Sequence, residues 1–167
     1  MAEQPDAAQL CFGCGRENPR GLGLRFRLVD GRAVAEFTPA AYLQGFPGFL
    51  HGGGVATMLD EAMGWATYGQ DVWAMTGRMT VRFRRPIPVE EPLTVSGWVV
   101  RDRGRFLELR SELRSSQDIL MAEAEGLFVR VSGQQLEEMR RFYETSDPGW
   151  AAGRQTETMT SLQEGRP

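Results

Sequence analysis

The residues with the clearest chemical potential stand around the start of one predicted helix. His51 is followed by three glycines at positions 52–54, and a run with helical apolar spacing begins directly after them. Because glycine has no side chain, backbone N–H groups at this helix start are left bare, with a partial positive charge. Such groups can hold an anion or the oxyanion that develops at a carbonyl under attack. A flexible junction between loop and helix is the alternative interpretation.

Two adjacent acids lie on this helix, and the first stands nine residues beyond His51. Asp60 has small residues, Ala56 and Gly64, at the helical spacing of four, so a substrate can approach it closely. A carboxylate in such a position can activate water or attack a carbonyl carbon. Glu61 lies on another face of the helix. Paired acids are also typical of a solvated helix face, and a lone histidine such as His51 is often structural.

The predicted order of elements packs one helix on one sheet. Residues 24–28 and 32–37 form a hairpin, because an Asp-Gly turn separates them. The helix carries an apolar stripe made of Val55, Met58, Leu59, Ala62 and Ala66. Extended segments with turn residues at their joints follow over residues 73–84, 93–101, 105–113 and 119–131, and three or four such strands in succession predict an antiparallel meander. With a short closing helix over residues 134–143, the pattern predicts an α+β domain.

Length and composition indicate a single globular domain. The chain has 167 residues, of which 41% are hydrophobic and 25% charged, and both values are ordinary for a folded protein. We expect a mobile N-terminus over residues 1–10, one domain over residues 11–144 and a flexible tail over residues 145–167. The only two cysteines, Cys11 and Cys14, do not make a disulfide framework.

The charge balance argues against nucleic acid as a partner. There are 19 basic and 22 acidic residues, for a net charge of −3, whereas nucleic-acid binders normally carry a basic excess. Every basic residue is arginine, which reflects coding bias or the fit of guanidinium groups to phosphate. Since the sequence has neither a long apolar span nor a secretory signal pattern, we expect a cytoplasmic protein without membrane contact.

Taken together, these residues resemble a known family. His51-Gly52-Gly53, Asp60 at this spacing and Arg85-Pro86 after the following strand are similar to the PaaI-like branch of the hotdog-fold acyl-CoA thioesterases. The run Cys-Phe-Gly-Cys-Gly at residues 11–15, with Asn-Pro and Gly-Leu after it, resembles a subgroup of that branch. The resemblance covers residues 11–131. It implies a long antiparallel sheet wrapped around one central helix, and a homodimer or homotetramer with active sites at the dimer interface.

The resemblance also implies roles for individual residues. Asp60 matches the carboxylate that serves as general base or nucleophile, and Thr76 matches a hydroxyl that positions the attacking water. Gly52 matches the residue whose N–H polarises the thioester carbonyl, with Gly53 beside it, and His51 matches the residue that shapes this oxyanion site. The family chemistry needs no metal and no cofactor, and coenzyme A enters only as part of the acyl-CoA substrate.

A second group of residues is expected to contact the substrate. Besides Gly53, the group contains Glu61, Phe46, Phe49, Arg82, Arg84 and Arg85. The phenylalanines are expected to line the acyl pocket. The arginines, with Arg78, are candidates to meet the phosphates of coenzyme A, although alternating arginines on a strand are commonly solvated. Cys11 and Cys14 are half of a possible zinc site, but four ligands are the norm, so turn packing or a reducible cross-link is favoured.

The sequence therefore favours hydrolysis of acyl-CoA thioesters to free acid and coenzyme A. One alternative is a non-hydrolytic hotdog module that binds acyl-CoA or an acyl-carrier ligand, and it would not need Asp60 or Thr76. A second alternative is a hotdog dehydratase or hydratase, whose sites pair a histidine with an acid in a different local pattern.

Overall fold

The structure is a computed structural model that describes residues 10–146 of the chain. Its helices are α1 (Gly52–Tyr68), α2 (Gln134–Ser146) and the short 3-10 helix η2 (Ala41–Leu43). The strands are β1 (Arg27–Val29), β2 (Arg32–Phe37), β3 (Ala74–Phe83), β4 (Leu93–Asp102), β5 (Phe106–Ser115) and β6 (Leu120–Arg130). Within the described residues, no helix has the length and apolarity needed to cross a bilayer.

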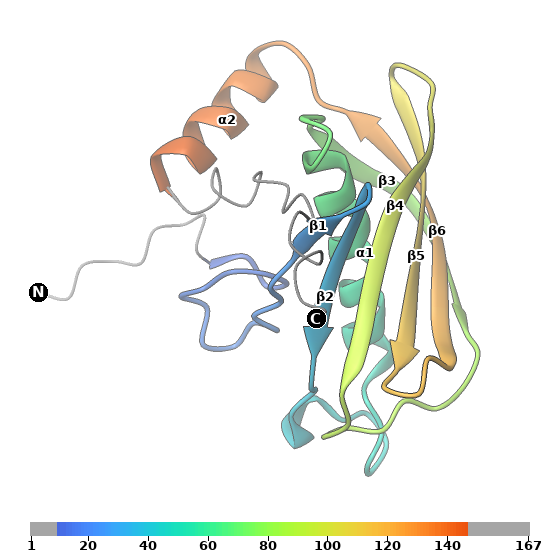
Figure 1. The fold of residues 1–167 in the computed structure, drawn as a ribbon. Helices are drawn as coiled ribbons and strands as arrows, with labels where there is room; N and C mark the ends of the chain where they lie inside the picture. The colour runs from blue at the N-terminus through green and yellow to red at the C-terminus, as the bar shows by residue number, and fades with distance from the viewer. Residues whose placement is uncertain (1–9, 147–167) are drawn as a thin grey trace, which may run out of the picture.

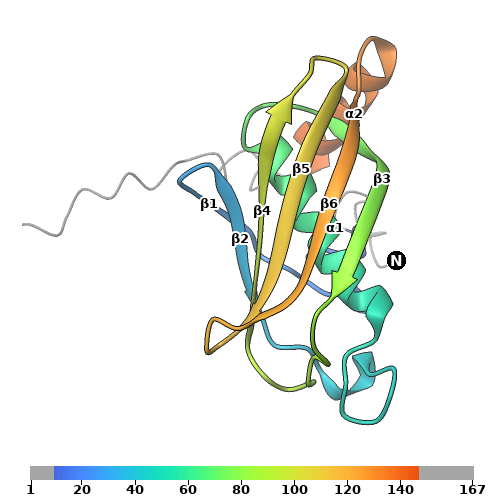
Figure 2. The same cartoon turned by 90° about the vertical axis from the view of Figure 1, so that its right-hand side faces the viewer.

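All strands join one antiparallel sheet, which packs along α1 (Figures 1 and 2). The strand order is β1-β2-β4-β5-β6-β3. The sheet wrapped around one helix is the arrangement that the family resemblance implies. The meander is confirmed for β4, β5 and β6. The meander therefore has three strands and not four, because β3 pairs with β6 at the far edge.

The connection between β3 and β4 explains this order. Residues 84–92 include Pro86, Pro88 and Pro92, which cannot donate a backbone hydrogen bond to a sheet ladder. The segment therefore makes no hairpin and carries the chain from one edge of the sheet to β4 (Figure 2). As a result β3 keeps one edge unpaired among residues 10–146.

The predicted apolar stripe of α1 forms the centre of the core. Each of its five residues is at most 2% exposed. The helix lies closest to the sheet at Gly97 of β4, where an added Cβ would stand 2.3 Å from the carbonyl oxygen of Ala62. At Gly126 of β6 an added Cβ would stand 2.8 Å from the sulfur of Met63. Glycine is thus required at position 97, where the backbone of α1 approaches the sheet, whereas at Gly126 the space of a side chain is filled by Met63 and Phe128.

Two element boundaries differ from the predicted ones. Strand β1 begins at Arg27 rather than at residue 24, because the Leu24 N–H donates to the Gly13 carbonyl at 2.9 Å and ties this segment to the N-terminal loop. Helix α2 extends to Ser146, past the predicted start of the tail at residue 145. Most of the predicted mobile ends, residues 1–9 and 147–167, lie outside the described part of the chain.

Candidate active site

His51 caps the start of α1. Its backbone is extended (φ −62°, ψ 137°), and its Nδ1 accepts a hydrogen bond of 2.9 Å from the Gly53 N–H. Nδ1 therefore carries no proton, and the neutral ring holds its proton on Nε2. The Gly53 N–H is occupied by this cap. Within residues 10–146, the Gly52 N–H has no hydrogen-bond partner, so Gly52 supplies the bare amide that the glycine run predicts.

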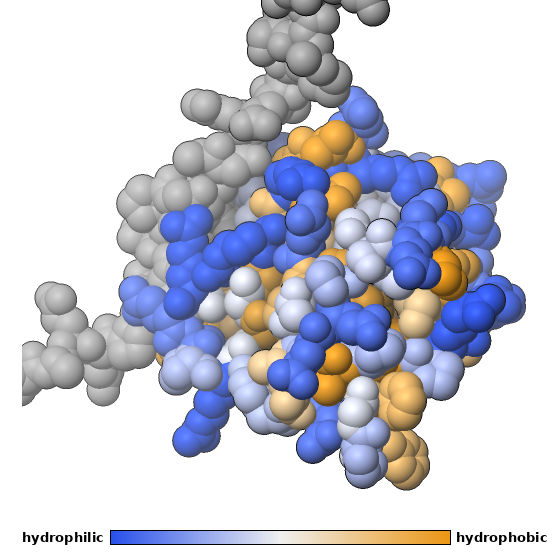
Figure 3. All heavy atoms as spheres, turned by 60° about the horizontal axis from the view of Figure 1, so that its bottom comes forward, coloured by the Kyte–Doolittle hydropathy of each residue, from blue (hydrophilic) through white to orange (hydrophobic). Residues whose placement is uncertain are grey.

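The end of β3 lies beside this amide. A Cβ built on Gly52 would meet the ring of Phe83, the last residue of β3, at 3.5 Å. Phe83 is 57% exposed. Viewed from the end at which α1 begins, apolar side chains interrupt the hydrophilic surface (Figure 3). The exposed Tyr42, Phe46 and Phe49 of the preceding loop contribute to the apolar surface of the chain.

The carboxylate of Asp60 is held by Thr76. The Thr76 hydroxyl, on β3, donates a hydrogen bond of 2.7 Å to Asp60 Oδ1. A β-bulge at Gly77 makes this contact possible, because the extra residue puts Thr76 on the helix-facing side together with Met79. Thr76 stands opposite Phe128, which is buried in the core. The structure thus brings together two residues that lie sixteen positions apart in the sequence.

Asp60 and the bare amide do not meet within one chain. Asp60 stands eight positions beyond Gly52 on the helix, which corresponds to about 12 Å along the axis at the α-helical rise. An oxyanion donor has to lie roughly 3 Å from the reacting oxygen. Within one chain, the Gly52 amide and the Asp60 carboxylate are therefore too far apart to act on the same carbonyl group, and the expected active site at a dimer interface stays a prediction.

Glu61 points away from Asp60 and contacts the N-terminal loop. The Cys11 thiol donates to Glu61 Oε1 at 3.1 Å. Burial raises the pKa of Glu61 to about 8, and the neighbouring Cys11 adds to this effect. A hydrogen bond from the Cys14 thiol lowers the pKa of Cys11, whereas the same bond and burial raise the pKa of Cys14. Sequence reasoning noticed the Cys-x-x-Cys pattern but missed its carboxylate partner.

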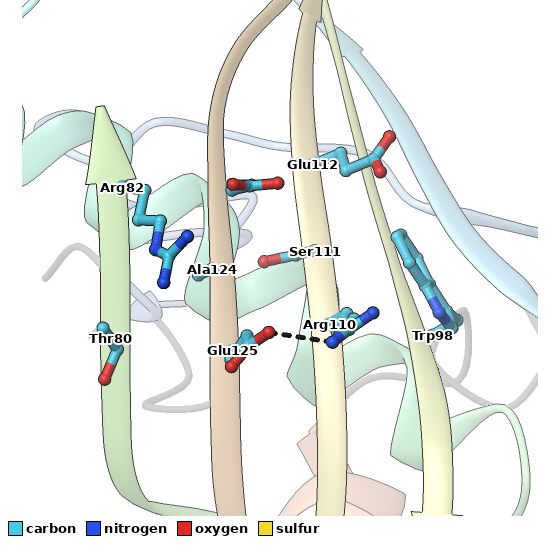
Figure 4. A pocket seen from close by; sticks show the side chains of 9 residues that line it. Thr80, Arg82, Trp98, Arg110, Ser111, Glu112, Ala124 and Glu125 are labelled. Carbon is cyan, nitrogen blue, oxygen red and sulfur yellow. Dashed lines mark hydrogen bonds and ion pairs between the residues drawn. The ribbon is translucent and has the colours of Figure 1, made fainter. Parts of the chain in front are cut away.

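The arginines lie apart from Asp60. Arg82 stands beside Thr80 on the sheet face opposite α1, in a hollow that also contains the Arg110–Glu125 ion pair of 2.9 Å (Figure 4). Arg78 lines a neighbouring hollow on the same face. This follows from strand alternation beyond the bulge, where Val81 packs on the core and Arg82 is exposed.

The remaining predicted contacts gather near the end of β3. Arg84 pairs with Glu123 of β6. Arg85 and Phe49 line one hollow of about 440 Å³ beside the connection between β3 and β4. Phe46 is 82% exposed. Within one chain the structure therefore brings Phe49 and Arg85 together, but it does not bring Arg82 to Asp60.

Comparison with known proteins supports the family resemblance. Residues 47–122 match the thioesterase superfamily. Acyl-coenzyme A thioesterase THEM4 of Bos taurus is 37% identical over 134 residues, which are 77% of this chain and 54% of the relative. The E. coli PaaI protein from the phenylacetic acid degradation operon superposes with a TM-score of 0.63 at 26% identity, covering 67% of this chain and 82% of that one. Together these matches support a PaaI-like hotdog thioesterase, the family that the sequence resembles.

Another solved member of the thioesterase superfamily is 32% identical, with a TM-score of 0.67, over 69% of this chain and 60% of that one. The hotdog thioesterase match includes His51, Gly52, Asp60 and Thr76. Cys11 and Cys14 precede it. The chain spans about half the length of the curated thioesterases it matches.

Proposed function

We propose that this hotdog thioesterase hydrolyses acyl-CoA thioesters to a free acid and coenzyme A. The observation that carries the proposal is the hydrogen bond from Thr76 to Asp60 at the open edge of the sheet. A partly buried carboxylate with its own hydroxyl donor is suited to proton transfer or nucleophilic attack. Relatives named acyl-coenzyme A thioesterases support the choice of substrate class.

In the proposed reaction, the Gly52 N–H donates to the thioester carbonyl oxygen. Asp60 removes a proton from water as the water oxygen forms a bond to the carbonyl carbon, and the negative charge moves to the carbonyl oxygen. The bare amide at the helix start stabilises this oxyanion. When the carbonyl re-forms, the carbon–sulfur bond breaks, and the thiolate of coenzyme A takes the proton from Asp60. Direct attack by Asp60 to give an anhydride is the nucleophilic variant of this scheme.

We further propose that the active site forms between two chains, because Gly52 and Asp60 lie too far apart in one. Strand β3 presents a long unpaired edge, which favours pairing with another strand. If two copies of β3 pair antiparallel about a twofold axis, the Thr76 end of one copy lies beside the Phe83 end of the other. Phe83 stands next to Gly52. Asp60 of one chain then faces the helix start of its partner.

The same pairing gives roles to the other expected contacts. Phe49 and Arg85 of one chain line a hollow near the end of β3, and in the dimer this region adjoins the partner's Thr76. We propose that the apolar loop around Phe46 and Phe49 receives the acyl group. Arg84 and Arg85 are placed to bind the phosphates of coenzyme A. Arg82 lies on the sheet face opposite α1, so it could bind them only if the coenzyme reached that face.

A thiol-release assay over short, medium, long and aromatic acyl-CoA thioesters tests this function. We expect turnover with at least one class, accompanied by the matching free acid. Calorimetric binding of acyl-CoA without any thiol release would instead support a non-hydrolytic binding module. Hydration of an enoyl-CoA without release of thiol would indicate the hydratase alternative.

A further inference from the structure

The N-terminal loop packs closely against α1 at Gly13. A Cβ built on Gly13 would stand 2.2 Å from Cγ of Glu61, so only glycine permits this approach. The loop is held in shape by backbone hydrogen bonds, among them Gly15 N–H to the Cys11 carbonyl at 2.9 Å and Leu24 N–H to the Gly13 carbonyl. This turn presents both cysteine sulfurs toward Glu61.

Three ligand-type atoms converge at this contact. The sulfurs of Cys11 and Cys14 and a carboxylate oxygen of Glu61 all lie within 4.8 Å of one another. Cys11 Sγ and Glu61 Oε1 are 3.1 Å apart. A tetrahedral zinc centre, with Zn–S of about 2.3 Å and Zn–O of about 2.1 Å, places such atoms roughly 3.5–3.8 Å apart. Small side-chain adjustments are therefore enough to form the centre.

In the described part of the chain, acidic groups lie around Glu61 and no basic side chain forms an ion pair with it. The thiols of Cys11 and Cys14 lie beside its carboxylate, and Asp60 precedes it on the helix. No salt bridge among residues 10–141 includes Glu61. In their deprotonated forms these three groups would bring negative charges together in a partly buried place, which is unfavourable without a cation. A divalent cation would offset two of the three negative charges that two thiolates and a carboxylate carry.

We propose that Cys11, Cys14 and Glu61 bind a zinc ion, with water in the fourth position. Paired thiolates two residues apart are the usual half of a zinc site, and soft sulfur ligands select zinc over magnesium or calcium. From the sequence we expected no metal, because only the two cysteines could be recognised as ligands there. The structure supplies Glu61 as the third ligand from a helix fifty residues away.

The ion would fasten the N-terminal loop to the central helix. Each ligand binds in its deprotonated form, so protons leave the thiols and the carboxyl group for the solvent. Because the loop also binds the strand segment before β1 through Leu24, zinc would stabilise the folded chain rather than take part in thioester hydrolysis. The inference therefore stands independently of the proposed activity.

Cobalt binding provides a direct test, since the chain has no other cysteines. The full chain is stripped of metal with a strong chelator and reduced with a phosphine until both thiols titrate. Co²⁺ is then added as the chloride. We expect thiolate-to-cobalt charge-transfer absorption that saturates near one ion per chain and is abolished by added Zn²⁺. Zn²⁺, but not Mg²⁺, should raise the melting temperature of the stripped protein.

Variants assign the ligands. C11S and C14S should lose the charge-transfer absorption, and E61Q should keep both thiols but bind cobalt at least about tenfold more weakly. E17Q, which changes an exposed acid of the same loop, should bind like the parent. Reduced parent protein with two free thiols that gives no thiolate–cobalt absorption would overturn the proposal, even if the cysteine variants failed to fold. Unchanged cobalt affinity in E61Q would remove the carboxylate from the site.

Discussion

Thr76 and Asp60 join the edge of the sheet to the middle of the central helix through a hydrogen bond of 2.7 Å. The hydroxyl occupies Oδ1 and leaves the second carboxylate oxygen for water or substrate. Since strand β3 is anchored to β6 along nearly its whole length, the bond also restricts the rotation of the Asp60 side chain. This geometry gives the first two predictions.

Asp60→Asn should abolish most thioester hydrolysis. The amide cannot accept a proton from water, so we expect kcat to fall by about 10²–10⁴-fold, the usual contribution of a general base. The melting temperature should stay close to that of the parent, because asparagine can still accept the bond from Thr76. Asp30→Asn, at an exposed turn, is the matched control and should retain full activity. Undiminished turnover by Asp60→Asn would exclude this carboxylate from the mechanism.

Thr76→Val should weaken catalysis while Thr76→Ser preserves it. A hydrogen bond to a charged group contributes about 1.5–3 kcal/mol, so the valine variant should lose roughly tenfold or more in kcat. We expect little change in KM, because Thr76 is proposed to hold the carboxylate rather than the acyl-CoA. Equal loss in the serine variant would show that the threonine methyl group, and not the hydroxyl, matters.

Gly52→Pro removes the bare amide with little disturbance of the helix. Gly52 is the first residue of α1, where proline is well tolerated, and the extended backbone of His51 suits a residue before proline. Loss of an oxyanion donor should reduce kcat by about 10²–10³-fold. Gly52→Ala, which keeps the N–H, should remain active. If both variants were equally impaired, side-chain bulk near Phe83 would be the cause.

Mixing inactive variants tests whether the site is shared between chains. A heterodimer of Asp60→Asn and Gly52→Pro would contain one site with both defects and one intact site, so an equal mixture of exchanging chains should recover about a quarter of parental activity. A site built from one chain would give no recovery. Sedimentation of each variant checks that both still form dimers, and a fully active monomer would contradict the composite site.

Two glycines with opposite surroundings test the packing of helix on sheet. Gly97→Ala would push a methyl group against the backbone of Ala62 and should lower the free energy of unfolding by about 1–3 kcal/mol. Gly64→Ala, inside α1 with no atom within 4 Å of the added carbon, should raise it by about 0.5–1 kcal/mol. Urea unfolding of both variants measures the difference. If the two variants were equally stable, the strand at Gly97 would be able to move away from α1 and make room for the added methyl group.

Local patterns in the sequence were sufficient to predict α1 and the hairpins and to single out the motif that begins at His51. The apolar spacing from Val55 identified the buried face of α1, because a helix repeats every 3.6 residues regardless of what it packs against. The turn residues between β4, β5 and β6 likewise identified hairpins, which depend on neighbouring residues alone. His51, Gly52 and Asp60 were recognisable as candidates because their spacing along one helix is itself the family pattern, and their catalytic roles stay predictions.

Only the tertiary structure decided which distant residues meet. Simple alternation would put Thr76 on the same face as Arg82, and the bulge at Gly77 reverses this so that Thr76 reaches Asp60. The pairing of β3 with β6 and the contact of Cys11 with Glu61 join segments about fifty residues apart. Such contacts depend on how whole elements pack, and the periodicity of a single segment carries no information about its partner.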